Sequence, residues 1–399
     1  MQGGVGVLQG RGLGGCCPLR RRDAYRRAVL RNTRYKRASW LALACACALT
    51  ATSCGGASGG AKSASAAGTP QSAGTSQAST SPTTSHADPT STSSSSTTST
   101  TAPVPAITPL RAPASVTPIG GAGVQGQGVW SPAGRTVGGN PAIYETNLVP
   151  PGGSTAAGVA WMDTRLLSAR LYSGSLSPGG GPYIFTAPVL PAQAASLVAA
   201  FNGGFMMSVA HGGYYTEGKV IDPLVTGAAS LVIYSDGSVN VGAWGSDVSM
   251  TSNVVAVRQN LVPLVANGQP TALASTPYWL DWGATCGVNT CVGAGIENQW
   301  RSGLGITADG ALVYVTGPSL APLQLAQLLV AAGAIRGMQL DINPNWTVLA
   351  TYNPPPGGLA SPANGSKLVA STVQGPATFF EAAWARDFVT MSARIATAG

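Results

Sequence analysis

The chain has 399 residues, of which 44% are hydrophobic and only 9% are charged, and its formal net charge is +8. Ten of its 22 Lys and Arg lie in residues 1–37 beside a single acid, so the remaining residues carry 12 basic and 13 acidic side chains. A nucleic-acid-binding surface needs clustered Lys and Arg, and the body of the chain has no excess of basic side chains. Nucleic-acid binding is therefore excluded for this part of the chain. The only two histidines, His86 and His211, exclude a His-rich zinc centre.

Residues 1–54 have the features of an export signal. Nine Lys and Arg between Arg20 and Arg37 precede an apolar run over residues 40–49, which is shorter than the ~20 apolar residues that span a bilayer. The run leads into Thr-Ala-Thr-Ser-Cys54-Gly-Gly, which resembles the bacterial lipobox, where the cysteine is acylated. We therefore expect lipidation at Cys54 and a place on the outer face of the cell membrane, held by the lipid alone. The alternatives are an uncleaved anchor and plain secretion.

Residues 55–118 consist mostly of Ser, Thr, Ala, Gly and Pro, with unbroken Ser and Thr over residues 91–101. Such a segment has too little apolar surface to offset the entropy lost on ordering, so we expect a disordered linker. It would separate the signal region from a domain over residues 119–399.

Two cysteines, Cys286 and Cys291, belong to the expected domain, and the other five lie in the signal region. In an oxidising compartment, we expect this pair to form a disulfide across the four intervening residues. A metal centre would need further thiolate or histidine ligands nearby, and the sequence offers none there.

The expected domain is long enough to bury one sizeable core. Moving along the chain, helical patterns cover residues 191–198, 320–332 and 377–388. Apolar runs flank Asp236-Gly237 and Asp309-Gly310, a pattern typical of β-hairpins. These signals predict an α+β fold, with a strand-rich single globular domain containing a few helices.

Polar residues gather where three apolar runs end. The first run ends in Asn202-Gly203-Gly204, where glycines would let the backbone approach a ligand and the Asn amide would orient it. The second contains Arg301, whose guanidinium suits phosphate or carboxylate. The third delivers a carboxylate, Asp341, at the end of a short strand. The alternatives are an ordinary turn, a snorkelling surface arginine and a turn-capping aspartate.

The order of these motifs resembles the phosphodiester glycosidase family. The resemblance spans residues 200–345 and is carried by Asn202-Gly-Gly-Phe, Arg301-Ser-Gly-Leu-Gly, Asp309-Gly, a Leu- and Ala-rich helix ending at Gly333, and Leu340-Asp341. The family usually has Leu-Asp-Gly-Gly-Gly-Ser at the last motif, whereas this chain has Leu340-Asp-Ile-Asn-Pro-Asn. Glycines would let backbone amides enclose an anion, so this departure puts phosphate recognition by the loop in question.

The resemblance implies a cell-envelope hydrolase that cleaves a sugar-1-phosphodiester or related glycosidic bond in a carbohydrate or glycophospho-conjugate. We expect Asp341 to act at the anomeric carbon, and Glu217 or Glu297 to supply a second carboxylate. The expected substrate-binding residues are Asn202, Gly203, Gly204, Arg301 and Asn343. No cofactor is required, although a divalent cation held by oxygens of Asp341 and Asn343 is compatible with the sequence.

Two further expectations concern function. Tryptophans near these segments, Trp346 among them, fit stacking on a sugar, and burial in the core is the alternative. The alternative function is a catalytically inactive envelope lipoprotein that binds a glycan or a partner.

Overall fold

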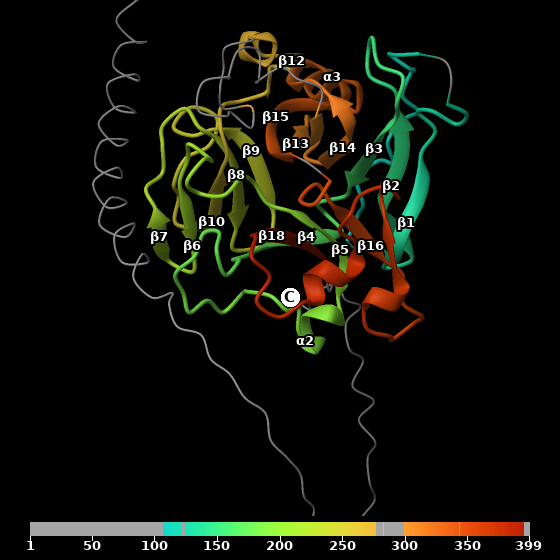
Figure 1. Ribbon diagram of the computed structural model, residues 1–399. Coiled ribbons are helices and arrows are strands. Elements are labelled where there is room, and N and C mark those ends of the chain that lie inside the picture. Colours follow the sequence, from blue (N-terminus) through green and yellow to red (C-terminus); the bar gives the residue numbers. More distant parts are fainter. Residues whose placement is uncertain (1–106, 122–123, 277–281, 283–298, 343, 395–399) are drawn as a thin grey trace, which may run out of the picture. The chain divides into compact units, whose positions relative to one another are not determined.

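Three sheets of antiparallel strands build the described part of the chain (Figure 1). The structure is a computed structural model and describes residues 107–121, 124–276, 282, 299–342 and 344–394. Strands greatly outnumber helices in these ranges, in agreement with the strand-rich fold expected from the sequence. Within the same ranges, no helix is both long and apolar enough to cross a bilayer.

The first sheet has eight strands in the order β1-β2-β3-β14-β13-β15-β11-β12. Its hairpin of β13 and β14 confirms the prediction at Asp309-Gly310, and Gly310 has a φ of 92°, which favours glycine. The strands are β1 (Ser131–Val137), β2 (Asn140–Leu148), β3 (Ala157–Met162), β11 (Val265–Ala266), β12 (Gln269–Pro270), β13 (Gln299–Thr307), β14 (Leu312–Leu320) and β15 (Ala334–Ile342).

The second sheet has five strands in the order β7-β6-β10-β8-β9. Strands β8 and β9 form the hairpin predicted at Asp236-Gly237. The strands are β6 (Tyr214–Thr216), β7 (Lys219–Asp222), β8 (Ala229–Tyr234), β9 (Val239–Ala243) and β10 (Val254–Gln259).

The third sheet also has five strands, in the order β17-β16-β5-β18-β4. Its strands are β4 (Leu167–Tyr172), β5 (Leu197–Asn202), β16 (Leu349–Tyr352), β17 (Gly365–Lys367) and β18 (Phe388–Ala393). Strand β5 lies between β16 and β18, so its end at Asn202 is enclosed by both neighbours.

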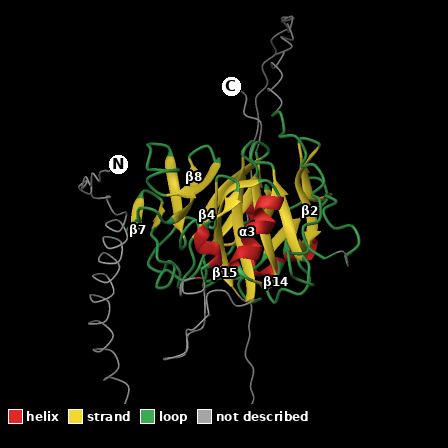
Figure 2. Ribbon diagram, turned by 90° about the horizontal axis from the view of Figure 1, so that it is seen from above, coloured by secondary structure: helices red, strands yellow, loops and turns green. Residues whose placement is uncertain are grey.

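One of the three predicted helices, residues 320–332, is confirmed over residues 322–331. Helix α3 (Pro322–Ala331) covers one face of the first sheet, as Figure 2 shows, and buries its leucine stripe against that sheet. The remaining helical elements are single turns: α2 (Pro191–Ala194), η1 (Ala272–Ser275), η4 (Pro362–Asn364) and η5 (Pro376–Phe380).

The helix predictions for residues 191–198 and 377–388 are wrong beyond their first turns. The first segment enters β5 at Leu197, and the second passes through η5 and a loop before β18 begins at Phe388. Both positions are fully buried within the third sheet, and the Phe388 ring stacks on Tyr172 with centroids 4.7 Å apart. Burial of this kind outweighs the helix preference of alanine-rich sequence.

All three sheets contribute to one apolar core. It takes Met162 and Leu304 from the first sheet, Leu231 from the second, and Phe201 and Met391 from the third. Because the sheets face this shared core, the ends of strands from different sheets meet around it.

Ordered packing begins before the expected boundary at residue 119. Leu110, assigned from the sequence to the disordered linker, is buried, and its backbone amide donates to Asp163 Oδ2 over 2.7 Å. Ile107 and Val116 of the same segment also pack against the core. The predicted lipidation site Cys54, the predicted disulfide Cys286–Cys291 and residues 1–106 lie outside the described residues.

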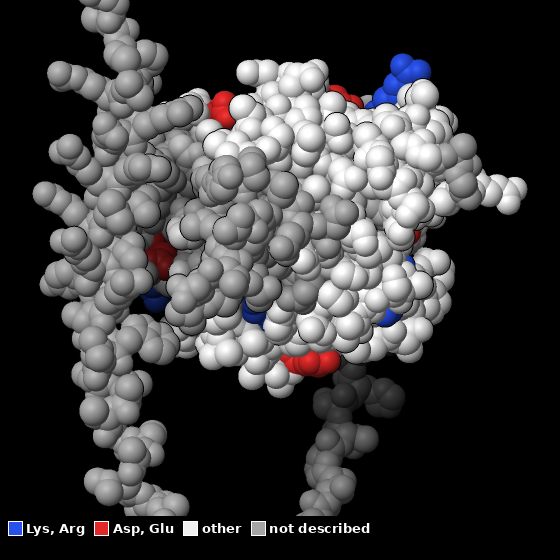
Figure 3. Space-filling view, turned by 45° about the horizontal axis from the view of Figure 1, so that its top comes forward, with Lys and Arg blue, Asp and Glu red and all other residues white. Residues whose placement is uncertain are grey.

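Charged side chains stand singly on the face drawn in Figure 3, which is otherwise uncharged where it is described. This distribution agrees with the near balance of acids and bases after residue 37.

Candidate functional site

Strand ends from all three sheets meet in a buried polar cluster. Its members, which we call the Asp341 cluster, are Asn202, Gly203, Gly204, Arg258, Asn260, Ser302, Asp341, Arg386 and Asp387. They come from the ends of β5, β10 and β15, the first half of β13 and the residues just before β18. The cluster therefore joins segments that are far apart in the sequence.

Asn202 connects the third sheet to the first. Its Nδ2 donates to Ser302 Oγ over 3.1 Å, and its Oδ1 accepts from the Tyr314 hydroxyl over 2.7 Å. Further bonds join Nδ2 to the Gly203 carbonyl and Oδ1 to the Val348 amide. Both ends of the amide are thus used within the protein, and the expectation that Asn202 orients a ligand is not supported.

An irregularity in β15 sets the direction of Asp341. Between the pairs Arg301–Ile342 and Gly303–Gln339, the register of β13 and β15 shifts, and the Asp341 amide donates to Ser302 Oγ over 3.1 Å. Bulges of this kind redirect side chains at the end of a strand. Asp341 Oδ1 accepts from the Ile342 amide over 2.7 Å, while Oδ2 pairs with Arg386 Nη2.

Asp341 is only 4% exposed. Burial raises the pKa of its carboxyl to about 7, although the nearby Arg386 acts to lower it. The charged and neutral forms of Asp341 are therefore both populated near neutral pH, as suits a general acid or base.

A second ion pair lies beside the first. Arg258 donates two hydrogen bonds to Asp387, from Nε to Oδ2 over 2.8 Å and from Nη2 to Oδ1 over 3.2 Å. Both side chains are almost fully buried, and Asp387 is adjacent in the chain to Arg386. Bidentate geometry of this kind makes the strongest arginine–carboxylate contacts.

The two glycines make room for these side chains. A Cβ at Gly203 would lie 2.0 Å from Asp387 Oδ2, and one at Gly204 would lie 2.6 Å from Asn260 Oδ1. Asn260 itself donates to the carbonyls of Gln339 and Leu340, which steadies the strand leading to Asp341. The close approach foreseen at these glycines is made by the protein's own polar groups.

Arg386 contacts both a carboxylate and an aromatic ring. Its Nη2 also donates to the Gly204 carbonyl over 2.9 Å, and its Cζ lies 4.9 Å from the centre of the Trp346 ring. The Trp346 ring lies 5.7 Å from that of Trp384, and both indoles are half-buried. Buried Arg386 Nε has no hydrogen-bond partner in the described structure.

Arg301 does not belong to this cluster. It is fully buried, and it donates to the Leu320 and Trp282 carbonyls and to Gln339 Oε1. Its neighbour Ser302 points to the opposite face of β13, toward Asn202. These three contacts are to neutral protein oxygens outside the Asp341 cluster, and the anion-clamp role of Arg301 stays a prediction.

Glu217 is also a structural residue in this geometry. Its two carboxylate oxygens accept from the backbone amides of Ile184 and Phe185 over 3.0 and 2.9 Å. It occupies the turn between β6 and β7 with a φ of 52°. We therefore do not retain it as the second carboxylate. The other candidate, Glu297, and the predicted substrate-binding residue Asn343 lie outside the described residues.

A cavity of about 660 Å³ lies elsewhere, at the β13–β14 hairpin. Trp130, Trp161 and Asp309 are among its lining residues, and no member of the Asp341 cluster is. Over the described residues, no group of three or more His, Cys, Asp or Glu side chains is arranged to hold a metal ion.

Sequence reasoning missed Arg386 and Asp387 because both lay inside a predicted helix. The signal that could have revealed them is an adjacent pair of opposite charges before the apolar run Phe388-Val389 in a chain with so few charges.

Neither a known protein-family profile nor a curated protein matches the chain. Among solved structures, it is similar to the catalytic domain of zebrafish N-acetylglucosamine-1-phosphodiester alpha-N-acetylglucosaminidase, auto-inhibited by its pro-peptide. That match has 15% identity and a TM-score of 0.38, and covers 67% of this chain and 88% of that one.

Two bacterial structures are similar at a lower level. A hypothetical protein from Synechocystis has 11% identity and a TM-score of 0.32, with coverage of 66% and 64%. A putative exported protein from Burkholderia pseudomallei has 12% identity and a TM-score of 0.29, with coverage of 64% and 75%. Similarity this distant does not establish a shared activity, so the chemistry of the chain has to be argued from its own site.

Proposed function

We propose that the chain is an exported hydrolase that cleaves a sugar-1-phosphodiester or a related glycosidic bond, with Asp341 as the carboxylate at the anomeric carbon. The observation that carries the proposal is Asp341 itself. It is a buried carboxylate at a strand bulge, its pKa is raised to about 7, and an arginine stacked on tryptophan lies against it.

The chemistry needs only one such carboxylate. A phosphate monoester has a second pKa of about 6 and departs without strong acid assistance, unlike the alcohol released in ordinary glycoside hydrolysis. The bond between the anomeric carbon and the bridging oxygen breaks, and its electron pair leaves with the phosphate. Water adds to the carbon and gives up a proton, so the products are a free sugar and a phosphate monoester. Ionised Asp341 stabilises or attacks the carbon as positive charge develops there.

The aromatic groups beside Asp341 support a sugar substrate. Trp346 and Trp384 are half-buried and close to each other, and indole faces of this kind provide apolar contact area together with a polar edge. The motif order that resembles phosphodiester glycosidases points to the same substrate class.

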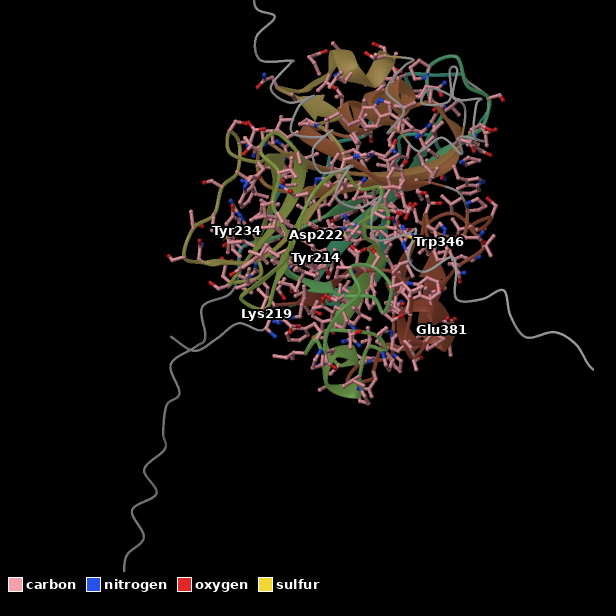
Figure 4. All side chains as sticks on the ribbon, turned by 60° about the vertical axis from the view of Figure 1, so that its left-hand side comes forward. Tyr214, Lys219, Asp222, Tyr234, Trp346 and Glu381 are labelled. Carbon is pink, nitrogen blue, oxygen red and sulfur yellow. The ribbon has the colours of Figure 1, made fainter. Side chains whose placement is uncertain are left out.

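The test is turnover by the full chain of p-nitrophenyl glycosides and sugar-1-phosphodiesters. Substitution Asp341→Asn is expected to lower kcat by about 10²–10⁴-fold. The control is Glu381→Gln, which should leave kcat unchanged. Glu381 is an exposed carboxylate and lies on the same side of the view as Trp346 in Figure 4. Hydrolysis in H₂¹⁸O should place the label in the sugar, and label in the phosphate would refute cleavage at carbon.

Because Asp341→Asn also removes the charge opposite Arg386, its fold is checked by circular dichroism. If that variant unfolds, Asp341→Glu keeps the charge and moves the carboxylate by one methylene, and it should lose activity while folded. Full activity in either folded variant would contradict the role of Asp341.

The second candidate function is glycan binding without catalysis. It is favoured by the internal bonds that occupy Asn202 and both oxygens of Asp341. Measurable binding of an oligosaccharide with no turnover of any substrate would support this function over hydrolysis.

A further inference from the structure

The two buried arginines of the Asp341 cluster hold their carboxylates differently. Arg258 donates from Nε and Nη2 to the two oxygens of Asp387. Arg386 contacts Asp341 Oδ2 through Nη2, while the other carboxylate oxygen, Oδ1, accepts from the Ile342 amide. The Nε–Nη2 edge of Arg386 is therefore one acceptor short.

The missing acceptor costs free energy in the folded protein. Arg386 Nε is buried and unpaired among the described residues, and an unsatisfied buried donor on a charged group is among the costlier defects of a fold. An oxygen of a bound molecule would remove this cost. A phosphate ester offers two oxygens at the spacing that a guanidinium edge recognises.

We propose that Arg386 is the receptor for an anionic phosphate group of the substrate, which takes the place of Asp341 on the Nε–Nη2 edge. This inference rests on the proposed function, in which Asp341 is the reacting carboxylate. Arg386 Cζ lies 4.9 Å from the centre of the Trp346 ring, a cation–π contact that does not use the N–H donors of the guanidinium.

The exchange would also free the carboxylate. Asp341 is held by Arg386 before the substrate arrives, and a phosphate on Arg386 would release Oδ2 toward the sugar. A neutral glycoside has no group that can displace Asp341. A phosphodiester would therefore free Asp341, whereas Asp341 would stay paired with Arg386 when a neutral glycoside binds, so phosphodiesters should be the better substrates.

The first experiment measures binding of inorganic phosphate and of a sugar 1-phosphate to the full chain by calorimetry, independently of turnover. In Arg386→Gln, both dissociation constants should rise about tenfold or more. The dissociation constants of Arg386→Lys should lie between those of the wild type and those of Arg386→Gln. The matched control is Arg170→Gln, which alters an exposed arginine whose Cζ lies 4.0 Å from the centre of the Phe185 ring. It should bind as the wild type does.

The second experiment compares substrates and pH profiles. In Arg386→Gln, kcat/KM for a sugar-1-phosphodiester should fall about 10- to 100-fold more than kcat/KM for a neutral p-nitrophenyl glycoside. In the wild type, the acid limb of kcat should lie at higher pH than that of kcat/KM for the phosphodiester, because bound phosphate separates Asp341 from the guanidinium that favours its ionised form. The two limbs should coincide for the neutral glycoside.

Unchanged phosphate binding in folded Arg386→Gln would overturn the inference, whether or not any substrate turns over. Equal losses on both substrates with phosphate binding intact would also overturn it and leave Arg386 a structural residue. If phosphate binding depends on Arg386 but nothing is hydrolysed, the anion site stands and the proposed hydrolase function fails. If Arg386→Gln does not fold, Arg386→Lys answers the same questions with the charge retained.

Discussion

Gly203→Ala offers the most direct test of how the ion pair between Arg258 and Asp387 is built. The new Cβ would lie 2.0 Å from Asp387 Oδ2 and 2.8 Å from the Asp387 backbone oxygen. That backbone oxygen accepts from the Gly203 amide over 2.9 Å, so the main chain cannot withdraw without losing this bond. The carboxylate must therefore leave Arg258, to which it is bound over 2.8 Å.

The expected loss follows from the burial of Arg258, which is 1% exposed. Breaking a buried ion pair on one side costs about 3–5 kcal/mol, out of about 5–15 kcal/mol for a whole domain. For a domain of this size, about 2–4 °C of melting temperature accompanies each kcal/mol, so Gly203→Ala should melt roughly 6–20 °C below the wild type.

The assay is thermal unfolding followed by circular dichroism. Gly121→Ala is the control, because Gly121 is exposed and a Cβ at this position would meet its nearest atom at an ordinary 3.7 Å. Asp387→Asn should cost a similar amount, and combining it with Gly203→Ala should add little, since both changes break the same contact. Melting of Gly203→Ala within about 2 °C of the control, or fully additive losses in the double variant, would refute the reasoning.

Three further predictions concern charge. The wild-type kcat/KM should fall about tenfold per pH unit below about pH 7, where Asp341 becomes protonated, and a flat profile down to pH 5 would contradict its role. Burial also raises the pKa of Glu145 from 4.5 to about 7, so its contribution to stability is full below pH 4.5 and lost as pH rises to 7. Glu145→Gln should reduce the decline in the free energy of unfolding between pH 4.5 and 7 seen in urea titrations, and an unaltered decline would show that Glu145 does not cause it. Arg301→Lys should lower the melting temperature but leave phosphate binding intact, whereas weakened binding in the folded variant would support the anion clamp.

Local signals in the sequence were sufficient for the hairpins and for α3. The turn at Asp309-Gly310 and the leucine stripe of α3 depend on residues that are neighbours in the chain. Asp341 was also found locally, as a polar residue at the end of an apolar strand.

The remainder of the site depends on register and on long-range pairing. Whether Arg301 or Ser302 faces Asn202 is decided by the side of β13 on which each residue falls, and a shift of one residue would exchange them. Arg258 lies in β10 of the second sheet and Asp387 lies just before β18 of the third, and no periodicity connects them. The alanine-rich segment before β18 has a helical pattern, but it forms η5 and a loop that lead into β18, whose strand is set by pairing with β5 and β4.

The meeting of three sheets in one cluster also affects when activity can arise during folding. Asn202 and Ser302 are 100 residues apart, and Arg258 and Asp387 are 129 apart, so each contact closes a long loop. Contacts between residues so far apart in the sequence form slowly and depend on the docking of whole sheets. In a nascent or partly unfolded molecule with one sheet detached, Asn202, Arg258 or Asp341 would not be in its place in the cluster. Under the proposed function, activity would then require completion of the fold, and incompletely folded chains would be inactive.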